Sequence, residues 1–330
     1  MKYLSANDIK KVFSMRDAID ADAEALGLYS AGRADIPLRT NINVPEYKGQ
    51  SLYMPGYVSG GNPSLGIKIV SVYPENIKAG LPSVPATMIT LDAKTGIVNA
   101  ILDGTYLTQL RTGAVQGAAT ELLSREDSKT ALLIGTGGQG IGQLEAMLTV
   151  RKLETVYVSD IDQERAQAFC DAAEKNFNQK FGTKFKTVKS PNDVVADVDI
   201  ITSVTTSKQP TFDGSLVTPG THINGVGAYT PEMCEIPIEA ISKANTIVFD
   251  TMDGVLAEAG DIIQPMKRGQ LSKDDIDGEL GAVVNKKLQG RKSPDDITFF
   301  KTVGTAALDV VVADRIVKQA EEKEIGVNLD

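Results

Sequence analysis

The chain has 330 residues, 42% of them hydrophobic and 23% charged, which is enough for two domains with sizeable cores in an ordinary globular protein. Its formal net charge of -9 argues against nucleic acid and anionic membrane surfaces as partners. The N-terminal stretch is charged throughout and no apolar run is long enough to span a bilayer, so we expect no signal peptide, no membrane association and a cytoplasmic location.

The first hundred residues predict helices followed by an antiparallel sheet. Ser5–Asp8 is typical of a helix cap, and the segment from Ile9 to about Ala31 is periodic enough for one or two helices, with a break near Met15–Asp17. Apolar or alternating runs separated by Pro and Gly follow, as in a meander of strands. We place these strands at Ile36–Val44, Ser51–Val58, Leu65–Tyr73, Met88–Asp92 and Gly96–Leu102, and a helix after them at about Tyr106–Leu123.

From Thr130 onwards the pattern changes to an alternation of strands and helices. Such alternation predicts a doubly wound parallel sheet of the Rossmann type. The predicted helices are Gly142–Leu153 and Gln163–Asn176, and the predicted strands are Ala131–Ile134, Thr155–Val158, Lys184–Val188, Asp199–Val204, Thr221–Val226 and Thr246–Phe249.

The tail Lys301–Lys323 predicts a long helix that begins at Gly304 and is too apolar to be exposed on all faces. We expect it to pack back on the first part of the chain. The predicted fold class is therefore α/β, with a Rossmann-type domain (residues 126–304) inserted into a second, α+β domain made of residues 1–125 and 305–330.

The stretch Thr130–Gln143 joins an apolar β-run to a glycine-rich turn and then to a helix. Gly135, Gly137 and Gly140 have the spacing G-x-G-x-x-G. The first glycine permits a tight turn, the second lets the backbone approach a pyrophosphate, and the third lets the helix pack closely on the strand. The phosphates would lie at the positive N-terminal end of that helix. The alternative is a strand–turn–helix junction whose glycines are incidental.

Asp160 ends the second predicted strand, roughly 20 residues after the glycines, where a carboxylate can accept hydrogen bonds from an adenosine ribose. A carboxylate repels a 2′-phosphate, so the sequence favours NAD over NADP, although the basic Arg165 could override this preference. The alternative role for Asp160 is that of a helix N-cap.

Three cationic residues interrupt apolar or alternating patterns. Arg111 falls on the apolar arc of the helix Tyr106–Leu123, where it pairs either with an Asp or Glu or with a substrate carboxylate. Lys68 interrupts an apolar strand, and a buried lysine loses its proton easily, which suits it to proton transfer near neutral pH. The alternative for Lys68 is protection of an edge strand against aggregation. The third residue, Arg39, is less diagnostic, and an exposed side chain on the surface is at least as consistent with its surroundings as a role in a binding site.

Histidine and cysteine usage excludes several kinds of site. His222 is the only histidine, so sites with several His ligands are excluded and we expect no bound metal. Its β-like surroundings favour a satisfied, partly buried imidazole. Cys170 and Cys234 lie far apart and show no metal-ligand pattern, which indicates a reducing compartment and no disulfide framework.

Several separate motifs, in one order along nearly the whole chain, resemble those of the ornithine cyclodeaminase/mu-crystallin family. They are Pro37-Leu38-Arg39, Tyr53-Met54-Pro55-Gly56, Gly66-Ile67-Lys68-Ile69-Val70, Leu110-Arg111-Thr112-Gly113-Ala114, Gly135-Thr136-Gly137-Gly138-Gln139-Gly140 and Phe300-Lys301-Thr302-Val303-Gly304.

The resemblance implies a two-domain homodimer that pairs the first-domain sheets and holds NAD(P) in a Rossmann domain. It implies that Arg39 and Arg111 bind the substrate carboxylate and that Lys68 transfers a proton beside the reacting nitrogen or carbon. It also implies a set of cofactor-binding residues: Arg111, Gly135, Gly137, Gly138, Gln139, Gly140, Ile141, Asp160, Thr205, Val226 and Thr302.

One departure from the family bears on the function. Cyclodeaminases of the family carry an aspartate in a G-x-D-x-P-G-K-x-E-L segment, where it would bind and activate the distal amine of the substrate. The corresponding segment here starts at Gly227 and has Tyr229 at the aspartate position. A phenol with a pKa of about 10 is a poor base at neutral pH, although Glu235 could reach the same point in space.

The favoured function is that of an NAD(P)-dependent oxidoreductase that transfers hydride at the α-carbon of an imino or amino acid. This class includes ketimine and cyclic-imine reductases and amino-acid dehydrogenases. One alternative is ornithine cyclodeaminase, which converts ornithine to proline and ammonia. The alternative from another class is a non-catalytic NAD(P)-bound binding protein.

Overall fold

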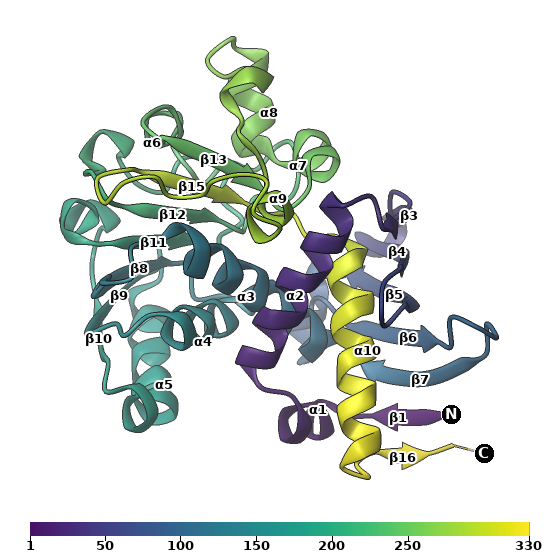
Figure 1. Ribbon diagram of the computed structural model, residues 1–330. Helices are drawn as coiled ribbons and strands as arrows, with labels where there is room; N and C mark the ends of the chain where they lie inside the picture. Colours follow the sequence, from purple (N-terminus) through teal and green to yellow (C-terminus); the bar gives the residue numbers. More distant parts are fainter. Residues whose placement is uncertain (330) are drawn as a thin grey trace. The chain divides into compact units, whose positions relative to one another are not determined.

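A computed structural model describes residues 1–329 of the chain, which divide into two compact units (Figure 1). Unit 1 consists of Met1–Arg111 together with the segment that begins at Thr305, and unit 2 is Thr112–Gly304. Helix α3 (Gly104–Leu123) runs from one unit into the other. In the described part of the chain, no helix combines the length and the apolar character needed to span a membrane.

Unit 1 is a sheet covered by helices. The sheet has the order β16-β1-β7-β6-β5-β4-β2, and β3 also pairs with β4. Helix α10 packs on β4, β5 and β6 and lies beside α2 (Figure 1). The elements are β1 (Lys2–Leu4), α1 (Ala6–Val12), α2 (Met15–Ser30), β2 (Ala34–Asp35), β3 (Thr40–Val44), β4 (Gly49–Val58), β5 (Ser64–Val72), β6 (Ala86–Leu91), β7 (Val98–Asp103), α10 (Ala306–Glu322) and β16 (Val327–Asn328).

The predicted meander of unit 1 is present, and its differences from the prediction have local causes. The helix break falls before Met15 because Ser14 and Asp17 form a capping box that starts α2. Strand β3 begins only at Thr40. Strand β1 was missed because it is only three residues long, and it pairs parallel to β7 in an otherwise antiparallel sheet.

Unit 2 contains an all-parallel sheet with the order β10-β9-β8-β11-β12-β15-β13-β14. This order confirms the predicted doubly wound sheet, and the change of direction lies between β8 and β11. The elements are β8 (Thr130–Ile134), α4 (Gly140–Val150), β9 (Thr155–Ser159), α5 (Gln163–Phe181), β10 (Lys184–Thr187), β11 (Ile200–Ser203), β12 (His222–Gly225), α6 (Ile238–Ser242), β13 (Thr246–Phe249), α7 (Met252–Glu258), α8 (Gly260–Lys267), β14 (Gly278–Glu279), α9 (Leu280–Val284) and β15 (Thr298–Lys301).

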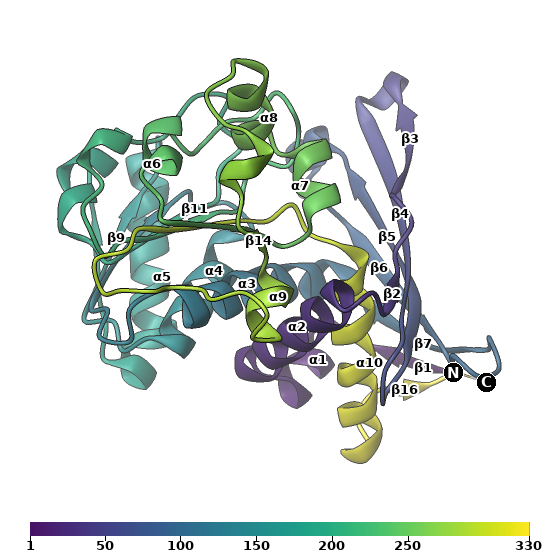
Figure 2. The ribbon, with the colours of Figure 1, turned by 45° about the horizontal axis from the view of Figure 1, so that its top comes forward.

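The sheet of unit 2 is buried on both faces, which explains its continuous apolar strands. In β8, Ala131 and Leu133 pack with α4 and α5, whereas Leu132 and Ile134 face the core that includes residues of α6, α7 and α8. Figure 2 shows these two groups of helices on opposite sides of the sheet. Strand β15 and the short helices α6–α9 were missed, and Lys301 belongs to β15 rather than to the tail helix, which begins at Ala306.

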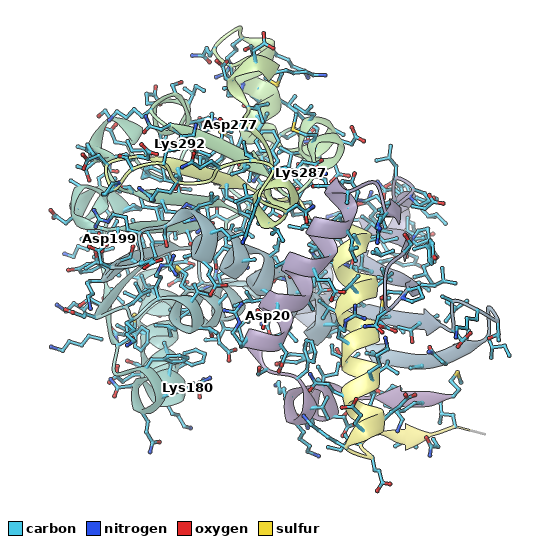
Figure 3. The ribbon with its side chains drawn as sticks, viewed as in Figure 1. Asp20, Lys180, Asp199, Asp277, Lys287 and Lys292 are labelled. Atoms are coloured by element: carbon cyan, nitrogen blue, oxygen red, sulfur yellow. The ribbon has the colours of Figure 1, made fainter. Side chains whose placement is uncertain are left out.

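Asp199 lies at the edge of this sheet at which the strands begin (Figure 3), and its contacts hold two strands together there. Its carboxylate accepts hydrogen bonds from the backbone N–H groups of Lys129 (2.7 Å) and Thr130 (2.9 Å), and it pairs with the guanidinium of Arg125. These contacts join the start of β11 to the start of β8. The glycine-rich turn, at the other end of β8, therefore follows a strand whose register is fixed.

His222 in β12 is fully buried, as the sequence partly predicted. Its Nδ1 lies 2.9 Å from Thr298 Oγ1 and its Nε2 lies 2.9 Å from Asn224 Oδ1. Burial, together with the positive charge of Arg291, lowers the pKa of the imidazole from 6.5 to about 3. The folded protein therefore holds this ring neutral at physiological pH.

We predict that His222 makes the fold sensitive to acid. Because its pKa is lower in the folded than in the unfolded chain, only the unfolded chain binds the proton between pH 6.5 and 3, and stability falls there as pH falls. In denaturant titrations, the unfolding free energy of the wild type should fall relative to that of His222→Gln by up to about 1.4 kcal/mol per pH unit below about pH 6. A difference that stays constant from pH 7 to pH 5 would contradict this assignment.

Candidate active site

Unit 1 contains a buried cluster of charges built from three elements. Lys68 in β5 is 1% exposed, and its Nζ lies 2.8 Å from both carboxylate oxygens of Asp309 in α10. Arg111 in α3 is 6% exposed, and its Nε lies 3.0 Å from Asp309 Oδ1. Asp309 itself is completely buried. One carboxylate is thus shared by two cations, and the cluster keeps a net positive charge.

The electrostatics of the cluster favour proton exchange by Lys68 near neutral pH. Burial lowers the pKa of Lys68 from 10.5 to about 7, the positive charges of Arg111 and Arg39 lower it further, and Asp309 opposes the shift. The charge of Arg39 therefore acts on the same ammonium group. The structure brings together Lys68 and Arg111, two predicted site residues, around a carboxylate that the sequence analysis missed.

A second buried carboxyl group, that of Asp22 in α2, lies within the electrostatic reach of the cluster. Burial raises its pKa well above the usual value, and the charge of Asp309 acts in the same direction against the opposing effect of Arg111. This shift favours the uncharged form of Asp22. Both aspartates interrupt apolar helix faces, the same signal that pointed to Arg111, so the sequence could have revealed them.

The glycine-rich turn of unit 2 has the geometry that a pyrophosphate needs. Gly135 has a φ of 100°, and a side chain there would meet the backbone of Val204 at 2.8 Å. A Cβ on Gly140 would lie 3.0 Å from Gly135 O, so this glycine allows α4 to start close to the strand. Gly137 and Gly138 instead border open space, and among the described residues no side chain caps the N-terminus of α4. The turn fits a dinucleotide phosphate.

Asp160 follows β9 and contacts the same turn. Its Oδ2 accepts hydrogen bonds from Thr136 N (2.9 Å) and Thr136 Oγ1 (2.6 Å), and Arg165 lies 3.8 Å away. Although burial opposes it, hydrogen bonding by Thr136 lowers the pKa of Asp160, so the carboxylate is ionised. A negative charge therefore stands next to the glycine turn, and the exposed Arg165 is close enough to weaken its effect.

The remaining predicted cofactor residues lie in or beside the loops that follow the parallel strands. Thr205 follows β11 and Val226 follows β12, where Val226 N donates to Ser203 O. Thr302 follows β15, is 2% exposed, and donates through its hydroxyl to Asp250 Oδ2 at 2.6 Å. Gln139 and Ile141 flank the first residue of α4. All of them lie near the carboxyl edge of the sheet, where open α/β sheets bind ligands.

The loop after β12 carries both Tyr229 and Glu235. The Tyr229 side chain is 37% exposed, whereas Glu235 is completely buried. Glu235 accepts hydrogen bonds through both oxygens, from Gly227 and Ala228 on one and from Ser203 and Thr205 on the other. The hypothesis that Glu235 replaces the missing aspartate is therefore wrong, because its carboxylate is occupied by the protein's own backbone and hydroxyl groups.

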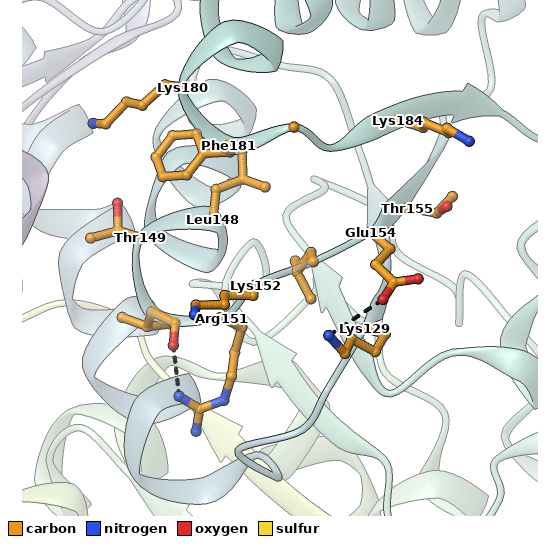
Figure 4. A pocket seen from close by; sticks show the side chains of 13 residues that line it. Lys129, Leu148, Thr149, Arg151, Lys152, Glu154, Thr155, Lys180, Phe181 and Lys184 are labelled. Carbon is orange, nitrogen blue, oxygen red and sulfur yellow. Dashed lines mark hydrogen bonds and ion pairs between the residues drawn. The ribbon is translucent and has the colours of Figure 1, made fainter.

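A cavity of about 810 Å³ opens at the opposite edge of the same sheet (Figure 4). It lies beside the starts of β9 and β10 and the ends of α4 and α5, and Lys152, Lys180 and Lys184 line it. Lys129 at its rim pairs with Glu154 at 3.3 Å. This cavity is far from the carboxyl ends of the strands and contains none of the predicted site residues.

An all-parallel doubly wound sheet whose first strand leads into a glycine-rich turn defines a Rossmann-type dinucleotide-binding protein. Residues 2–324 match the model of the ornithine cyclodeaminase/mu-crystallin family, and the chain belongs to this family. The resemblance seen in the sequence is thereby confirmed.

Three relatives illustrate the range of the family. The chain is 36% identical to a Delta(1)-pyrroline-2-carboxylate reductase of Bacillus cereus, over 100% of both chains. It is 31% identical to the alanine dehydrogenase of Archaeoglobus fulgidus, over 98% of this chain and 96% of the relative. The solved Thermococcus litoralis Delta(1)-pyrroline-2-carboxylate reductase, in complex with NADH and L-proline, is 39% identical, with a TM-score of 0.93 and full coverage of both chains.

We predict a preference for NADH over NADPH, set by the charge of Asp160. The wild type should show a kcat/KM at least about tenfold higher with NADH, because the carboxylate repels a 2′-phosphate. Asp160→Ser should lower this ratio and leave Arg165 available to the phosphate. The matched control is Asp162→Ser, which keeps a capping hydroxyl at the start of α5 and should retain the wild-type ratio. Equal kcat/KM values for the two cofactors in the wild type would refute the prediction.

Proposed function

We propose that the chain is an NADH-dependent reductase of a cyclic imino acid, with Delta(1)-pyrroline-2-carboxylate as its substrate and proline as its product. The observation that carries this proposal is the buried Lys68–Asp309–Arg111 cluster, which combines an anion-binding charge with a proton donor of near-neutral pKa. The names and bound ligands of relatives 36% and 39% identical over their full length support the choice of substrate.

The substrate carboxylate would bind to Arg111 and Arg39. Asp309 offsets one of the two positive charges of Lys68 and Arg111, so an added carboxylate would balance the other. Arg111 contacts Asp309 through Nε, at 3.0 Å from Oδ1. A guanidinium arranged in this way can bind a carboxylate with both terminal nitrogens.

Reduction of a C=N bond adds a hydride to carbon and a proton to nitrogen. When bound, NADH would supply the hydride, and the glycine turn and Asp160 would hold its pyrophosphate and ribose. Lys68 would supply the proton to the ring nitrogen, and Asp309 would keep the ammonium group of Lys68 in place at 2.8 Å. In the reverse direction neutral Lys68 would accept the proton from the amine. The residues of the chain thus bind, orient and protonate.

Tyr229 argues for a reductase against an ornithine cyclodeaminase. Cyclodeamination needs two hydride transfers and, between them, attack of a deprotonated distal amine on an α-imine. A tyrosine offers no negative charge to a distal ammonium, and Glu235 cannot supply one because it is buried and fully hydrogen-bonded. A cyclic imine needs one hydride and has no distal amine.

We also propose that the protein works as a cytoplasmic homodimer, as the family resemblance implies. A solved relative, an archaeal alanine dehydrogenase 31% identical to the chain, is described as a dimer with bound NAD. Light scattering at the elution peak of the purified protein tests this assembly, and the mass of a single 35.2 kDa chain would exclude it.

We predict that the imine substrate is reduced orders of magnitude faster than ornithine is deaminated. The assay follows NADH oxidation with Delta(1)-pyrroline-2-carboxylate, and separately ammonia and proline release from ornithine with NAD. Comparable rates would restore the cyclodeaminase alternative. NADH oxidation that fails with cyclic imines, and with 2-oxo acids plus amines, would favour a non-catalytic binding protein instead.

We further predict that the cluster controls the pH dependence of reduction. Lys68 donates a proton only in its charged form, so kcat for imine reduction should fall as pH rises through about 7. Lys68→Met should lower kcat by about 10²- to 10⁴-fold, the usual contribution of general acid catalysis. Arg111→Met should mainly raise KM for the imine, by about tenfold or more, because it removes a charge-assisted carboxylate contact.

Two variants, Arg111→Met and Asp309→Asn, should shift the pH at which kcat falls in opposite directions. Arg111→Met removes a cation that lowers the pKa of Lys68, so the fall in kcat should move to higher pH. Asp309→Asn removes the anion that raises this pKa, so the fall should move to lower pH. Far-UV circular dichroism would verify that each variant is folded. Identical pH limbs in both folded variants would show that the titrating group is not Lys68.

A further inference from the structure

Glu235 lies in a loop of unit 2, and its carboxylate accepts five hydrogen bonds. Its Oε2 accepts hydrogen bonds from Ser203 Oγ (2.8 Å), Thr205 N (2.7 Å) and Thr205 Oγ1 (3.1 Å). Its Oε1 accepts from Ala228 N (3.1 Å) and from Gly227 N. Ser203 ends β11, Thr205 lies in the loop after it, and Gly227 and Ala228 lie in the loop after β12. One side chain therefore ties the two loops together.

The two loops approach each other too closely for most residues. A Cβ on Gly227 would lie 2.1 Å from Thr205 O, so glycine is required there. The Thr205 methyl group would in turn lie 2.9 Å from a Cβ on Gly135, in the turn after β8. The Glu235 network therefore borders the glycine turn itself, at the point where the strand order changes direction.

The strand order shows which part of a dinucleotide these loops would serve. Asp160, which follows β9, lies on one side of the glycine turn, and the loops after β11 and β12 lie on the other. With the pyrophosphate on the turn and the adenosine ribose at Asp160, the other half of the dinucleotide extends over the loops that Glu235 joins.

We propose that Glu235 is a positioning residue of the dinucleotide site, whose ionised carboxylate holds the loops after β11 and β12 in the shape that binds the nicotinamide half of NADH. This inference rests on the proposed function, and it assigns to Glu235 a role through the loops rather than contact with the reactants.

The charges around Glu235 make this role dependent on pH. Lys301 in β15 lies 2.9 Å from Asp261 in α8 and 3.9 Å from Glu235, so one cation faces two buried carboxylates. Burial and the charge of Asp261 raise the pKa of Glu235 to about 7, against the opposing effect of Lys301. The thiol of the neighbouring Cys234 has a pKa of about 11 and stays neutral. Protonation of Glu235 would place an O–H group, which is a donor, opposite the N–H and O–H donors that now bind the carboxylate.

Affinity for NADH should therefore fall as pH falls through about 7, where the carboxylate becomes protonated. His222, with a pKa of about 3, does not titrate in this range. Lys68 does, at about 7, but it belongs to unit 1 and gains a proton as pH falls. The variant Lys68→Met separates the two groups, because it should keep the pH dependence of NADH binding.

The test is titration of the full chain with NADH alone, followed by nucleotide fluorescence, between pH 8 and pH 6. We expect Glu235→Gln to weaken NADH binding at pH 8 by about tenfold or more, since hydrogen bonds to a charged acceptor are lost, and to remove the pH dependence. The matched control is Glu232→Gln, an exposed glutamate of the same loop, which should bind NADH as the wild type does.

Three results would overturn the inference. They are an unchanged NADH affinity in folded Glu235→Gln, a wild-type affinity that is flat from pH 8 to pH 6, and loss of the pH dependence in Lys68→Met. The second and third need no Glu235 variant, so the test stands even if Glu235→Gln fails to fold. Absence of NADH binding by the wild type would instead refute the proposed function, and the two failures are therefore distinguishable.

Discussion

The site of unit 1 depends on one carboxylate shared by two cations. Asp309 lies within 3.0 Å of both Lys68 and Arg111, and all three side chains are buried. Two buried cations without it would be very costly, because desolvation penalises each charge. With it, a single positive charge remains unbalanced. Burial lowers the pKa of Lys68, the charge of Arg111 lowers it further, and the unbalanced charge would attract a carboxylate. In the proposed function, proton transfer and substrate binding would both depend on this arrangement of charges.

The second buried network, in unit 2, has the opposite balance. There Lys301 faces Glu235 and Asp261, so negative charge is in excess, and the pKa of Glu235 is raised. Five hydrogen bonds to the carboxylate offset part of the desolvation penalty. In unit 1 the excess charge is positive and lies where an anionic substrate is expected to bind. In unit 2 the excess charge is negative and lies where a carboxylate accepts hydrogen bonds from backbone N–H groups.

The sequence predicted the fold well where a pattern was long or chemically specific. The alternation of apolar strands and helices after Thr130 and the spacing of Gly135, Gly137 and Gly140 were sufficient for the Rossmann-type sheet. Short elements such as β1 and α9 carry no usable periodicity, so they were missed. In the site, Arg111 and Lys68 were found because each interrupts an apolar pattern. Asp309 was missed although it interrupts α10 in the same way, because its cationic partner Lys68 is 241 residues away in the sequence and only folding brings the two together.

In the loop after β12, the residues that fix the path of the backbone differ from the residue whose side chain is exposed. Ala228 N is fixed by Glu235, and Thr230 O accepts a hydrogen bond from Gly260 N at the start of α8. Tyr229 lies between these two fixed points with a partly exposed side chain. A change of residue at this position alters charge and size without changing the path of the backbone. An aspartate there would carry a negative charge that tyrosine lacks, while the hydrogen bonds of Ala228 N and Thr230 O on either side stay the same.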